Sequence, residues 1–187
     1  MNKEICVFLA DGFEEIEALT VVDLLRRAEV QVRTISITGK LTVHGAHGID
    51  VLADELFEQA EYDKIDMIVL PGGMPGTLHL LEHPGLEKVI QKFHEKEQYI
   101  AAICAAPSIL GDRGYLKGRV ATSHPSVIAR LTGAISTDKE VVQDGHIITS
   151  KGMGTAIVFS LKLIEILVDE EKAKTISNAI VFNEKGR

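Results

Sequence analysis

The sequence predicts an α/β fold in which a mostly parallel sheet is covered by helices on both faces. Three short apolar runs, at residues 5–10, 65–70 and 99–103, have the length and composition of buried strands. Segments with a helical spacing of apolar residues alternate with such runs along the chain. Strands that alternate with helices are joined by right-handed crossovers, and they form a parallel sheet between two helical layers, which is a three-layer sandwich.

The first predicted strand, at residues 5–10, is stopped by Asp11 and Gly12, and a helix is expected at residues 14–27. Apolar side chains recur on one face of this helix at Ile16, Leu19, Val22 and Leu25. Three glutamates fill its first turn, where negative charge is favourable.

The segment after this helix predicts a mixture of regular and irregular structure. Residues 31–37 alternate between polar and apolar side chains, which is typical of a strand, and a turn follows. Residues 41–51 are rich in glycine and histidine and are expected to hold short strands or an irregular hairpin. The strand at residues 65–70 ends at a Pro-Gly-Gly turn, and an amphipathic helix is predicted at residues 85–97.

In the second half, the strand at residues 99–103 is followed at once by small residues and a proline that open a helix. The remaining predicted elements are a strand at residues 119–122, a helix ending at residue 131, a hairpin at residues 141–149, and helices at residues 156–167 and 170–181. An Asp-Gly pair marks the hairpin turn. The chain contains no internal repeat, linker or low-complexity stretch, so residues 1–187 are expected to form a single domain.

Composition argues against several classes of partner. Hydrophobic residues make up 45% of the 187 residues and charged residues 25%, an ordinary globular balance. The net charge of -7 argues against binding to nucleic acid or to an anionic membrane, because both need a basic face. No apolar run approaches the ~20 residues of a membrane span, and the N-terminal apolar run is too short for a signal peptide. Two cysteines do not make a disulfide framework, so a cytoplasmic location is expected.

Cys104 is the residue whose setting is chemically most informative. It lies where the apolar run at residues 99–103 meets the following helix, and a thiol at a helix N-terminus is favoured as the thiolate. The same arrangement in hydrolases is called a nucleophile elbow. The alternative is a buried, inert cysteine that only fills space. That alternative is the better interpretation of Cys6, which lies inside an apolar run with no glycine, proline or helix start beside it.

Other candidates lie in the segments that follow predicted strands. The backbone N–H groups of Gly72 and Gly73 could face a developing oxyanion, or the two glycines could form a tight turn. Glu17 could be a solvated first-turn residue. Beside Cys104 it would have to be largely protonated, because two negative charges in a partly dry site repel each other. His124 could be a catalytic partner or a turn residue.

The histidines do not predict a metal site. His79 and His83 lie four residues apart on a helical face, but no third ligand accompanies them. Surface histidines are therefore expected there, and also at His44 and His47. Residues 151–155 resemble a phosphate loop but lack the Walker spacing, and close helix–sheet packing is the preferred interpretation.

Five short motifs follow one another along the chain. They are LADGFEEIE at residues 9–17, VLPGG at residues 69–73, AAICAAP at residues 101–107, TSHP at residues 122–125 and TSKGMGT at residues 149–155. In this combination the sequence resembles the ThiJ/PfpI superfamily, in the branch of the Parkinson-disease-associated protein deglycase. The resemblance covers nearly the whole chain, and it implies a flavodoxin-like α/β sandwich that usually forms a homodimer.

The resemblance also implies roles for particular residues. The nucleophile of the family falls on Cys104, and the glutamate that contacts it falls on Glu17. The oxyanion-type backbone donors fall on Gly73 and Ala105, and the histidine near the cysteine falls on His124. No metal, nucleotide, flavin or other cofactor is implied.

Two positions depart from the family pattern. The protease-like branch has a histidine directly after the cysteine, where this chain has Ala105, so a peptidase would lack its general base. Many members of the Parkinson-linked branch carry an arginine roughly where this chain has His47, so a role of that arginine is not carried over. Glutamine amidotransferases share the fold but use a late His-x-Glu element, and none follows Cys104.

The resemblance implies a cofactor-independent enzyme that acts on reactive dicarbonyls such as methylglyoxal, or on their adducts with protein side chains. Cys104 would attack the aldehyde, Gly73 and Ala105 would stabilise the oxyanion, and Glu17 would shuttle protons. The alternative is a redox-sensing or chaperone-like stress protein whose accessible cysteine is oxidised. A link to thiamine biosynthesis is a weaker alternative that no residue supports. The expected partners are a small dicarbonyl or glycated substrate and a second copy of the chain.

Overall fold

The computed structural model describes residues 3–182. Its centre is a seven-stranded sheet with the strand order β10-β11-β7-β6-β1-β2-β5. Neighbouring strands in this sheet are parallel except β10 and β11, which form an antiparallel hairpin at one edge. The strands of this sheet are β1 (Glu4–Leu9), β2 (Gln31–Ser36), β5 (Glu55–Leu56), β6 (Met67–Leu70), β7 (Tyr99–Ile103), β10 (Val141–Asp144) and β11 (Ile147–Ser150).

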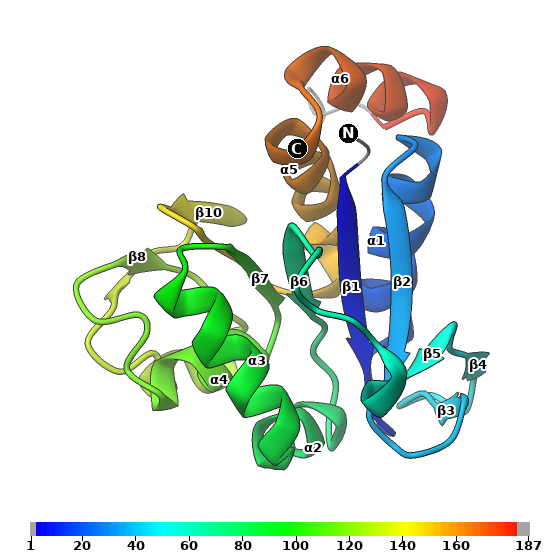
Figure 1. The fold of residues 1–187 in the computed structure, drawn as a ribbon. Coiled ribbons are helices and arrows are strands. Elements are labelled where there is room, and N and C mark those ends of the chain that lie inside the picture. Colours follow the sequence, from blue (N-terminus) through cyan, green and yellow to red (C-terminus); the bar gives the residue numbers. More distant parts are fainter. Residues whose placement is uncertain (1–2, 183–187) are drawn as a thin grey trace.

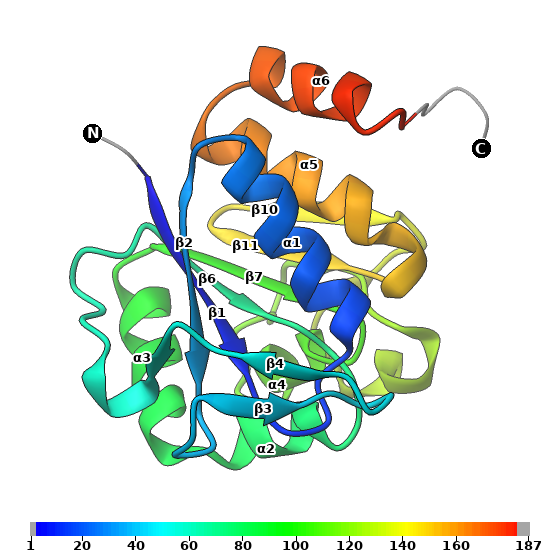
Figure 2. The ribbon, with the colours of Figure 1, turned by 90° about the vertical axis from the view of Figure 1, so that its right-hand side faces the viewer.

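Helices cover both faces of the sheet, as the sequence predicts (Figures 1 and 2). One face carries α1 (Glu15–Arg27) and α5 (Ala156–Leu167), and α6 (Glu170–Ala179) packs on the outer side of α5. The other face carries α2 (Gly76–Glu82), α3 (Pro84–Glu95) and α4 (Pro107–Asp112). The result is the mostly parallel, flavodoxin-like α/β sandwich that was expected.

Side-chain alternation along β1 shows how one central strand serves two cores. Ile5, Val7 and Leu9 belong to the core beneath α1 and α5, whereas Cys6 and Phe8 belong to the core beneath α3 and α4. All five side chains are fully buried. A parallel strand covered on both faces is therefore read in the sequence as a continuous apolar run rather than as an alternating one.

Two predictions in the second half are wrong in detail. The strand expected at residues 119–122 shrinks to β8 (Val120–Ala121), which pairs with β9 (Ile135–Ser136) outside the main sheet. The backbone N–H of Val120 donates to the carboxylate of Asp144, so a side chain accepts this hydrogen bond in place of a neighbouring strand. The helix expected to end at residue 131 is a 3₁₀ helix at Pro125–Arg130.

The first half of the chain contains a short hairpin and a short helix outside the main sheet. Residues 41–51 contain the antiparallel hairpin of β3 (Thr42–His44) and β4 (Asp50–Leu52), which lies apart from the main sheet. The helix α2 is not among the predicted elements, although His79 was assigned to a helical face, because its seven residues are too few to show a periodic apolar pattern. Within residues 3–182, no helix is both long enough and apolar enough to span a membrane.

Candidate active site

The candidate site lies at the carboxyl ends of three neighbouring strands. Because β7, β6 and β1 are adjacent in the sheet, the segments that follow them meet at one edge. Ligands of open α/β sheets bind at such an edge. These segments carry Cys104, the pair Gly72 and Gly73, and Glu17, so the structure brings together the three strand ends that the sequence singled out.

Cys104 has the backbone conformation of a nucleophile elbow. Its φ of 64° lies in the left-handed region, which costs a non-glycine residue about 1–2 kcal/mol. Two backbone hydrogen bonds hold it there: the Cys104 N–H donates to the carbonyl of Ser150 at 3.0 Å, and its own carbonyl accepts from the His124 N–H at 2.8 Å. The thiol is half-buried, at the junction of β7 and α4.

Gly72 lets the thiol and the glutamate approach the same peptide. A Cβ atom at this position would lie 2.7 Å from the Cβ of Cys104 and 2.7 Å from Oε2 of Glu17, so no larger residue fits without movement. The Gly72 N–H donates to Oε2 of Glu17 at 2.9 Å. The expectation that this N–H faces an oxyanion needs correction, because the Glu17 carboxyl already occupies it.

Two other N–H groups face the sulfur. The backbone N–H groups of Ala105 and Gly73 hydrogen-bond with the thiol of Cys104 and lower its pKa, opposing the groups that raise it. These are the donors that the family resemblance implied. Backbone N–H groups are the kind of donor from which an oxyanion hole is built.

Burial dominates the ionisation of Cys104. Burial, the charge of Glu17 and the hydrogen bond with Glu17 together raise the pKa of Cys104 to about 12. Burial and Glu17 thus oppose the thiolate that is expected from the helix N-terminus.

Glu17 is shifted in the same direction. Burial raises its pKa to about 7, with a further increase from the charge of Glu14, while hydrogen bonds with Cys104 and Gly72 oppose the shift. The side chain is only 1% exposed. Oε1 is buried and makes no hydrogen bond of ordinary geometry within residues 3–182. The groups that lower the pKa of Glu17 are the Cys104 thiol and the backbone N–H groups of Gly72 and Met153.

The carboxyl and the thiol titrate as a coupled pair. The first proton leaves near neutral pH, and the second is retained far into the alkaline range. At neutral pH and above, the pair of Glu17 and Cys104 thus holds one proton and one negative charge. Moving that proton from Sγ to the carboxyl makes a thiolate without changing the net charge of the site.

His124 lies at the edge of the site. A Cβ atom placed on Gly152 would be 3.6 Å from Sγ of Cys104, 3.8 Å from Oε1 of Glu17 and 3.8 Å from Cδ2 of His124, so three side chains converge on this glycine. The ring Nδ1 of His124 accepts from the Ser126 N–H at 3.2 Å and lies 2.8 Å from the Ser126 hydroxyl. Nε2 is then the nitrogen that can meet a bound molecule.

The other histidines have separate partners. Nδ1 of His79 lies 2.8 Å from the carbonyl of Asp11, and Nδ1 of His83 accepts from the Leu86 N–H at 3.0 Å to cap α3. The two imidazoles thus make different contacts through Nδ1.

Sequence reasoning missed a cluster beside the site. Ligand-type atoms of Glu14, Glu15 and His47 lie within 4.8 Å of one another. The ring N–H of His47 donates to Oε2 of Glu15 at 2.9 Å, so a proton already joins the two groups and we treat the cluster as an ion pair. Since 32 residues separate the partners, no local pattern could have revealed it.

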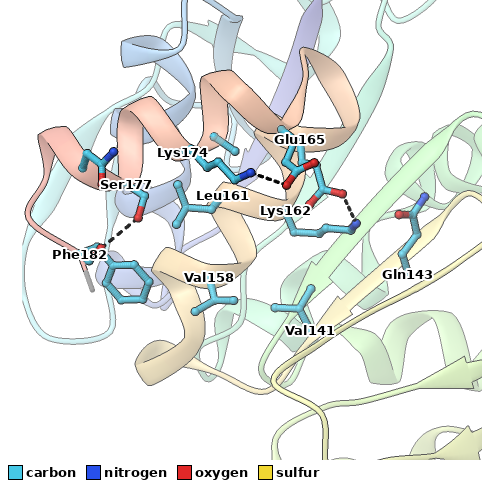
Figure 3. A pocket seen from close by; sticks show the side chains of 12 residues that line it. Val141, Gln143, Val158, Leu161, Lys162, Glu165, Lys174, Ser177 and Phe182 are labelled. Carbon is cyan, nitrogen blue, oxygen red and sulfur yellow. Dashed lines mark hydrogen bonds and ion pairs between the residues drawn. The ribbon is translucent and has the colours of Figure 1, made fainter. Parts of the chain in front are cut away.

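A pocket lies on another part of the molecule. A pocket of about 700 Å³ opens between β10, α5 and α6, with Val158, Leu161 and Phe182 among its lining residues (Figure 3). None of the candidate site residues lines it. This pocket is therefore separate from the strand ends where the candidate residues meet.

Comparison with known proteins shows the family to which the chain belongs. The family model described as the DJ-1/PfpI family matches residues 3–166. This chain belongs to the DJ-1/PfpI family. It is similar to Protein dj-1beta of Drosophila melanogaster, with 37% identity over 97% of this chain and 98% of that protein. It is also similar to the Schizosaccharomyces pombe protein named glutathione-independent glyoxalase DJ-1, with 28% identity over 95% of this chain and 97% of that protein.

The DJ-1 fold extends over the described chain. The solved structure of oxidized Toxoplasma gondii DJ-1 matches with a TM-score of 0.92 and 34% identity, covering 96% of this chain and 98% of that chain. The predicted family and fold class are confirmed. Cys104, Gly72 and Glu17, which the sequence analysis selected in the segments after three strands, lie close together in this member of the DJ-1/PfpI family.

Proposed function

We propose that this protein is a cofactor-independent cysteine enzyme that converts reactive dicarbonyls such as methylglyoxal into hydroxy acids. The observation that supports this most directly is the contact of the Cys104 thiol with both a carboxyl of pKa about 7 and two backbone N–H groups. The name of the Schizosaccharomyces pombe relative, a glutathione-independent glyoxalase, supports the same reaction class.

The first step is addition of the thiol to the aldehyde. As Sγ of Cys104 bonds to the aldehyde carbon, the thiol proton moves to the carboxylate of Glu17. The carbonyl oxygen becomes an oxyanion that accepts hydrogen bonds from the N–H groups of Gly73 and Ala105. Glu17 then returns its proton to this oxygen, and the product is a neutral hemithioacetal.

The second step moves hydrogen between two carbons. Glu17, again a carboxylate, removes the proton from the former aldehyde carbon and delivers it to the oxygen of the adjacent ketone, which gives an enediol. Glu17 then takes the hydroxyl proton on the first carbon and delivers a proton to the second carbon, which gives a 2-hydroxy thioester on Cys104. Water then displaces Sγ and releases lactate, so one methylglyoxal and one water give one hydroxy acid. A carboxyl with a pKa near the working pH is suited to alternate between acid and base in this way.

His124 is proposed to orient the substrate at the edge of the site. Its Nδ1 is engaged with Ser126, and its ring faces the region of Gly152 where Cys104 and Glu17 converge. The same groups could act on hemithioacetal- or hemiaminal-type adducts of protein side chains. Deglycation is therefore proposed as a second reaction of the same chemical class.

A redox-sensing or stress-protective role is the second candidate. A half-buried cysteine beside an acid can be oxidised to a sulfinate that the protonated acid stabilises by a hydrogen bond. The solved Toxoplasma gondii relative is described as oxidized, which favours considering this role. The proposed location of the protein is the cytoplasm, where reduction would keep the thiol free.

A homodimer is proposed as the working assembly. Ile16 is 51% exposed between two glutamates of the site segment, and Ile49 and Leu52 are 53% and 72% exposed on the neighbouring hairpin. A second copy that covers these apolar side chains would bury surface next to the candidate site. Light scattering of the purified protein would show a mass twice that of the chain, and a monomer at micromolar concentration would contradict the proposal.

The function is tested by following methylglyoxal consumption and lactate formation by proton NMR, without glutathione and in the presence of a metal chelator. We expect lactate to form in proportion to enzyme, and Cys104→Ser to abolish it. Lactate formation at the normal rate by this variant would overturn the cysteine mechanism. Selective addition of two oxygens to Cys104 by peroxide, without measurable turnover of dicarbonyls, would instead favour the redox role.

A further inference from the structure

The loop that contains His47 is fastened to the segment that leads into Glu17. The N–H of Gly12 donates to the carbonyl of His44 at 2.7 Å, and the N–H of Ala46 donates to the carbonyl of Phe13 at 2.9 Å. A β-bridge also joins Phe13 to Gly45. The two segments therefore hold a fixed relative position beside the candidate site.

Glu15 clamps His47 at two points. Its Oε1 accepts from the His47 backbone N–H at 2.7 Å, and its Oε2 accepts from the ring Nδ1–H at 2.9 Å. The Glu15 side chain is buried, and it passes so close to Gly45 that a Cβ atom there would lie 2.2 Å from Oε1. The imidazole is thus fixed, although its outer face is open to solvent.

Glu14 connects this clamp to the reactive pair. Its Oε2 lies 3.6 Å from Nδ1 of His47, and its backbone N–H donates to the carbonyl of Gly72 at 2.9 Å. Its charge is felt by Glu17, since it raises the pKa of that carboxyl. A positive charge on His47, 3.6 Å from the Glu14 carboxylate, opposes the negative charge through which Glu14 raises the pKa of Glu17.

The charges around His47 are few. From the start of α1 it faces Glu14 and Glu15, and on its own hairpin the nearest ionisable groups, His44 and Asp50, pair with each other at 2.6 Å. In the part of the chain that the structure describes, no lysine or arginine forms an ion pair with Glu14 or Glu15. His47 is thus the group whose protonation can balance these two carboxylates.

We propose that His47 is a positioning residue of the Cys104 site, and that its imidazolium balances Glu14 and Glu15 so that the pair of Glu17 and Cys104 ionises more readily. The proposal rests on the proposed function only in assuming that this ionisation matters for turnover. The charge on His47 itself is a property of the folded protein and can be tested without any substrate.

The direction of the pH dependence follows from the contacts. The hydrogen bond with Glu15 and the charge of Glu14 raise the pKa of His47 above 6.5, so the imidazolium persists to higher pH than on a free histidine. As pH rises through that raised pKa, the positive charge is lost. The field of Glu14 and Glu15 then acts unopposed, and ionisation of the reactive pair becomes harder.

The test measures the rate of Cys104 alkylation by iodoacetamide, followed by intact mass, at about pH 6, 7 and 9. His47→Gln keeps a side-chain donor for Glu15 but never carries charge, whereas His47→Arg is always charged. At pH 6 His47 is charged and the pair is only partly ionised, so we expect the Gln variant to react about two- to threefold more slowly than the parent and the Arg variant to match the parent. At pH 9 the pair has already lost its first proton, so both variants should react at nearly the rate of the parent.

Matched controls separate charge from structure. His44→Gln makes the same substitution on the same hairpin, but its partner is Asp50, so its alkylation profile should follow the parent. Cys104→Ser should take up no label, because Cys6 is fully buried. Rates that differ from the parent by the same factor at all three pH values would show a purely structural role for His47 and overturn the proposal, as would an equal change in His44→Gln.

The same variants are then assayed with methylglyoxal. A pH-dependent alkylation difference without turnover by any variant, including the parent, would support the role of His47 and reject the proposed enzyme function. Normal turnover in the parent, together with alkylation rates that do not depend on His47 charge, would reject the role of His47 alone. Far-ultraviolet circular dichroism at each pH establishes that every variant compared is folded.

Discussion

The two cysteines of this chain have similarly raised pKa values but very different surroundings. Burial raises the pKa of both Cys6 and Cys104 to about 12. Cys6 lies in the middle of β1, fully buried, and the nearby charges that act on it belong to Arg33, Glu4 and Glu55. Cys104 lies after the end of β7 in a left-handed conformation, half-buried, beside a carboxyl and two N–H donors.

The comparison shows that the pKa of a free thiol is a poor guide to its chemistry. What distinguishes Cys104 is a path for its proton, to Glu17, and hydrogen-bond donors for the charge that remains. Cys6 has neither, because both of its neighbours in the sheet are strand residues, Arg33 and Ile68. If Cys104 is the proposed nucleophile, then the strand end and its companions distinguish it from Cys6, since both thiols are raised in pKa by burial.

The largest expected effect separates the two thiols directly. Cys104→Ala should lower kcat/KM for methylglyoxal by roughly 10³-fold, because the attacking atom is removed. Cys6→Ala should leave kcat/KM within about twofold and lower the free energy of unfolding by about 1 kcal/mol, since only buried packing is lost. Lactate formation and urea unfolding measure the two quantities. Comparable activity losses in both variants would show that the loss arises from folding and not from the elbow.

The next effect tests whether the companions of Cys104 need their spacing. Gly72→Ala places a methyl group 2.7 Å from both the Cβ of Cys104 and Oε2 of Glu17, so the two groups must separate. We expect kcat/KM to fall about 100-fold, the effect of misplacing reacting groups by about 1 Å. Gly154→Ala is the matched control, because a Cβ there meets no atom within 4 Å. Full activity of the Gly72 variant would mean that Glu17 need not lie against Cys104.

The position of this site could be foreseen because it depends on sheet topology. Apolar runs alternating with helices imply a parallel sheet, and the order β7-β6-β1 then places Cys104, Gly72 and Glu17 at one edge. The chemical state of the site could not be foreseen in the same way. The high pKa of Cys104 comes from burial and from Glu17, and both are sums over atoms that are distant in sequence.

Contacts between distant segments account for the other differences. The N–H of Gly72 is taken by Glu17, 55 residues away, and no local pattern records such a bond. The same is true of His47, whose bonds to Glu15 cross from a hairpin to a helix start. Short elements such as α2 and β8 escaped prediction or were misplaced because a few residues carry no periodic signal.

A smaller effect is the pH dependence of the free energy of unfolding, which should differ between variants of Glu17 and of Cys6. Glu17 has its pKa raised from 4.5 to about 7, so the folded state binds this proton more tightly than the unfolded chain. Its contribution to stability is fully present below pH 4.5 and is lost as pH rises through about 7. Relative to Glu17→Gln, the parent should lose on the order of 2 kcal/mol over that range, because the shift is partly shared with the thiol.

Urea unfolding at pH 4.5 and at about pH 8 measures this difference in slope. Cys6→Ala serves as the control, because the raised pKa of Cys6 affects stability only in the alkaline range above its ordinary value of 9.0. Its pH slope should equal that of the parent. An equal slope for Glu17→Gln and the parent would mean that the Glu17 carboxyl is not buried in the protonated form.

The smallest effect is the difference in stability between glycine and alanine, which should have opposite signs at positions 104 and 6. At position 104 the backbone has a φ of 64°, where a side chain costs about 1 kcal/mol and glycine costs nothing. At position 6, inside β1, glycine is less stable than alanine by about 1 kcal/mol, because it loses more conformational freedom on folding. Comparing glycine with alanine at each position removes the loss of sulfur from the difference.

Cys104→Gly should therefore be more stable than Cys104→Ala, and Cys6→Gly less stable than Cys6→Ala, by urea unfolding. If glycine were the less stable residue at both positions, the strained elbow would not be a property of the folded protein, and the feature that separates the two thiols would be the neighbouring carboxyl alone.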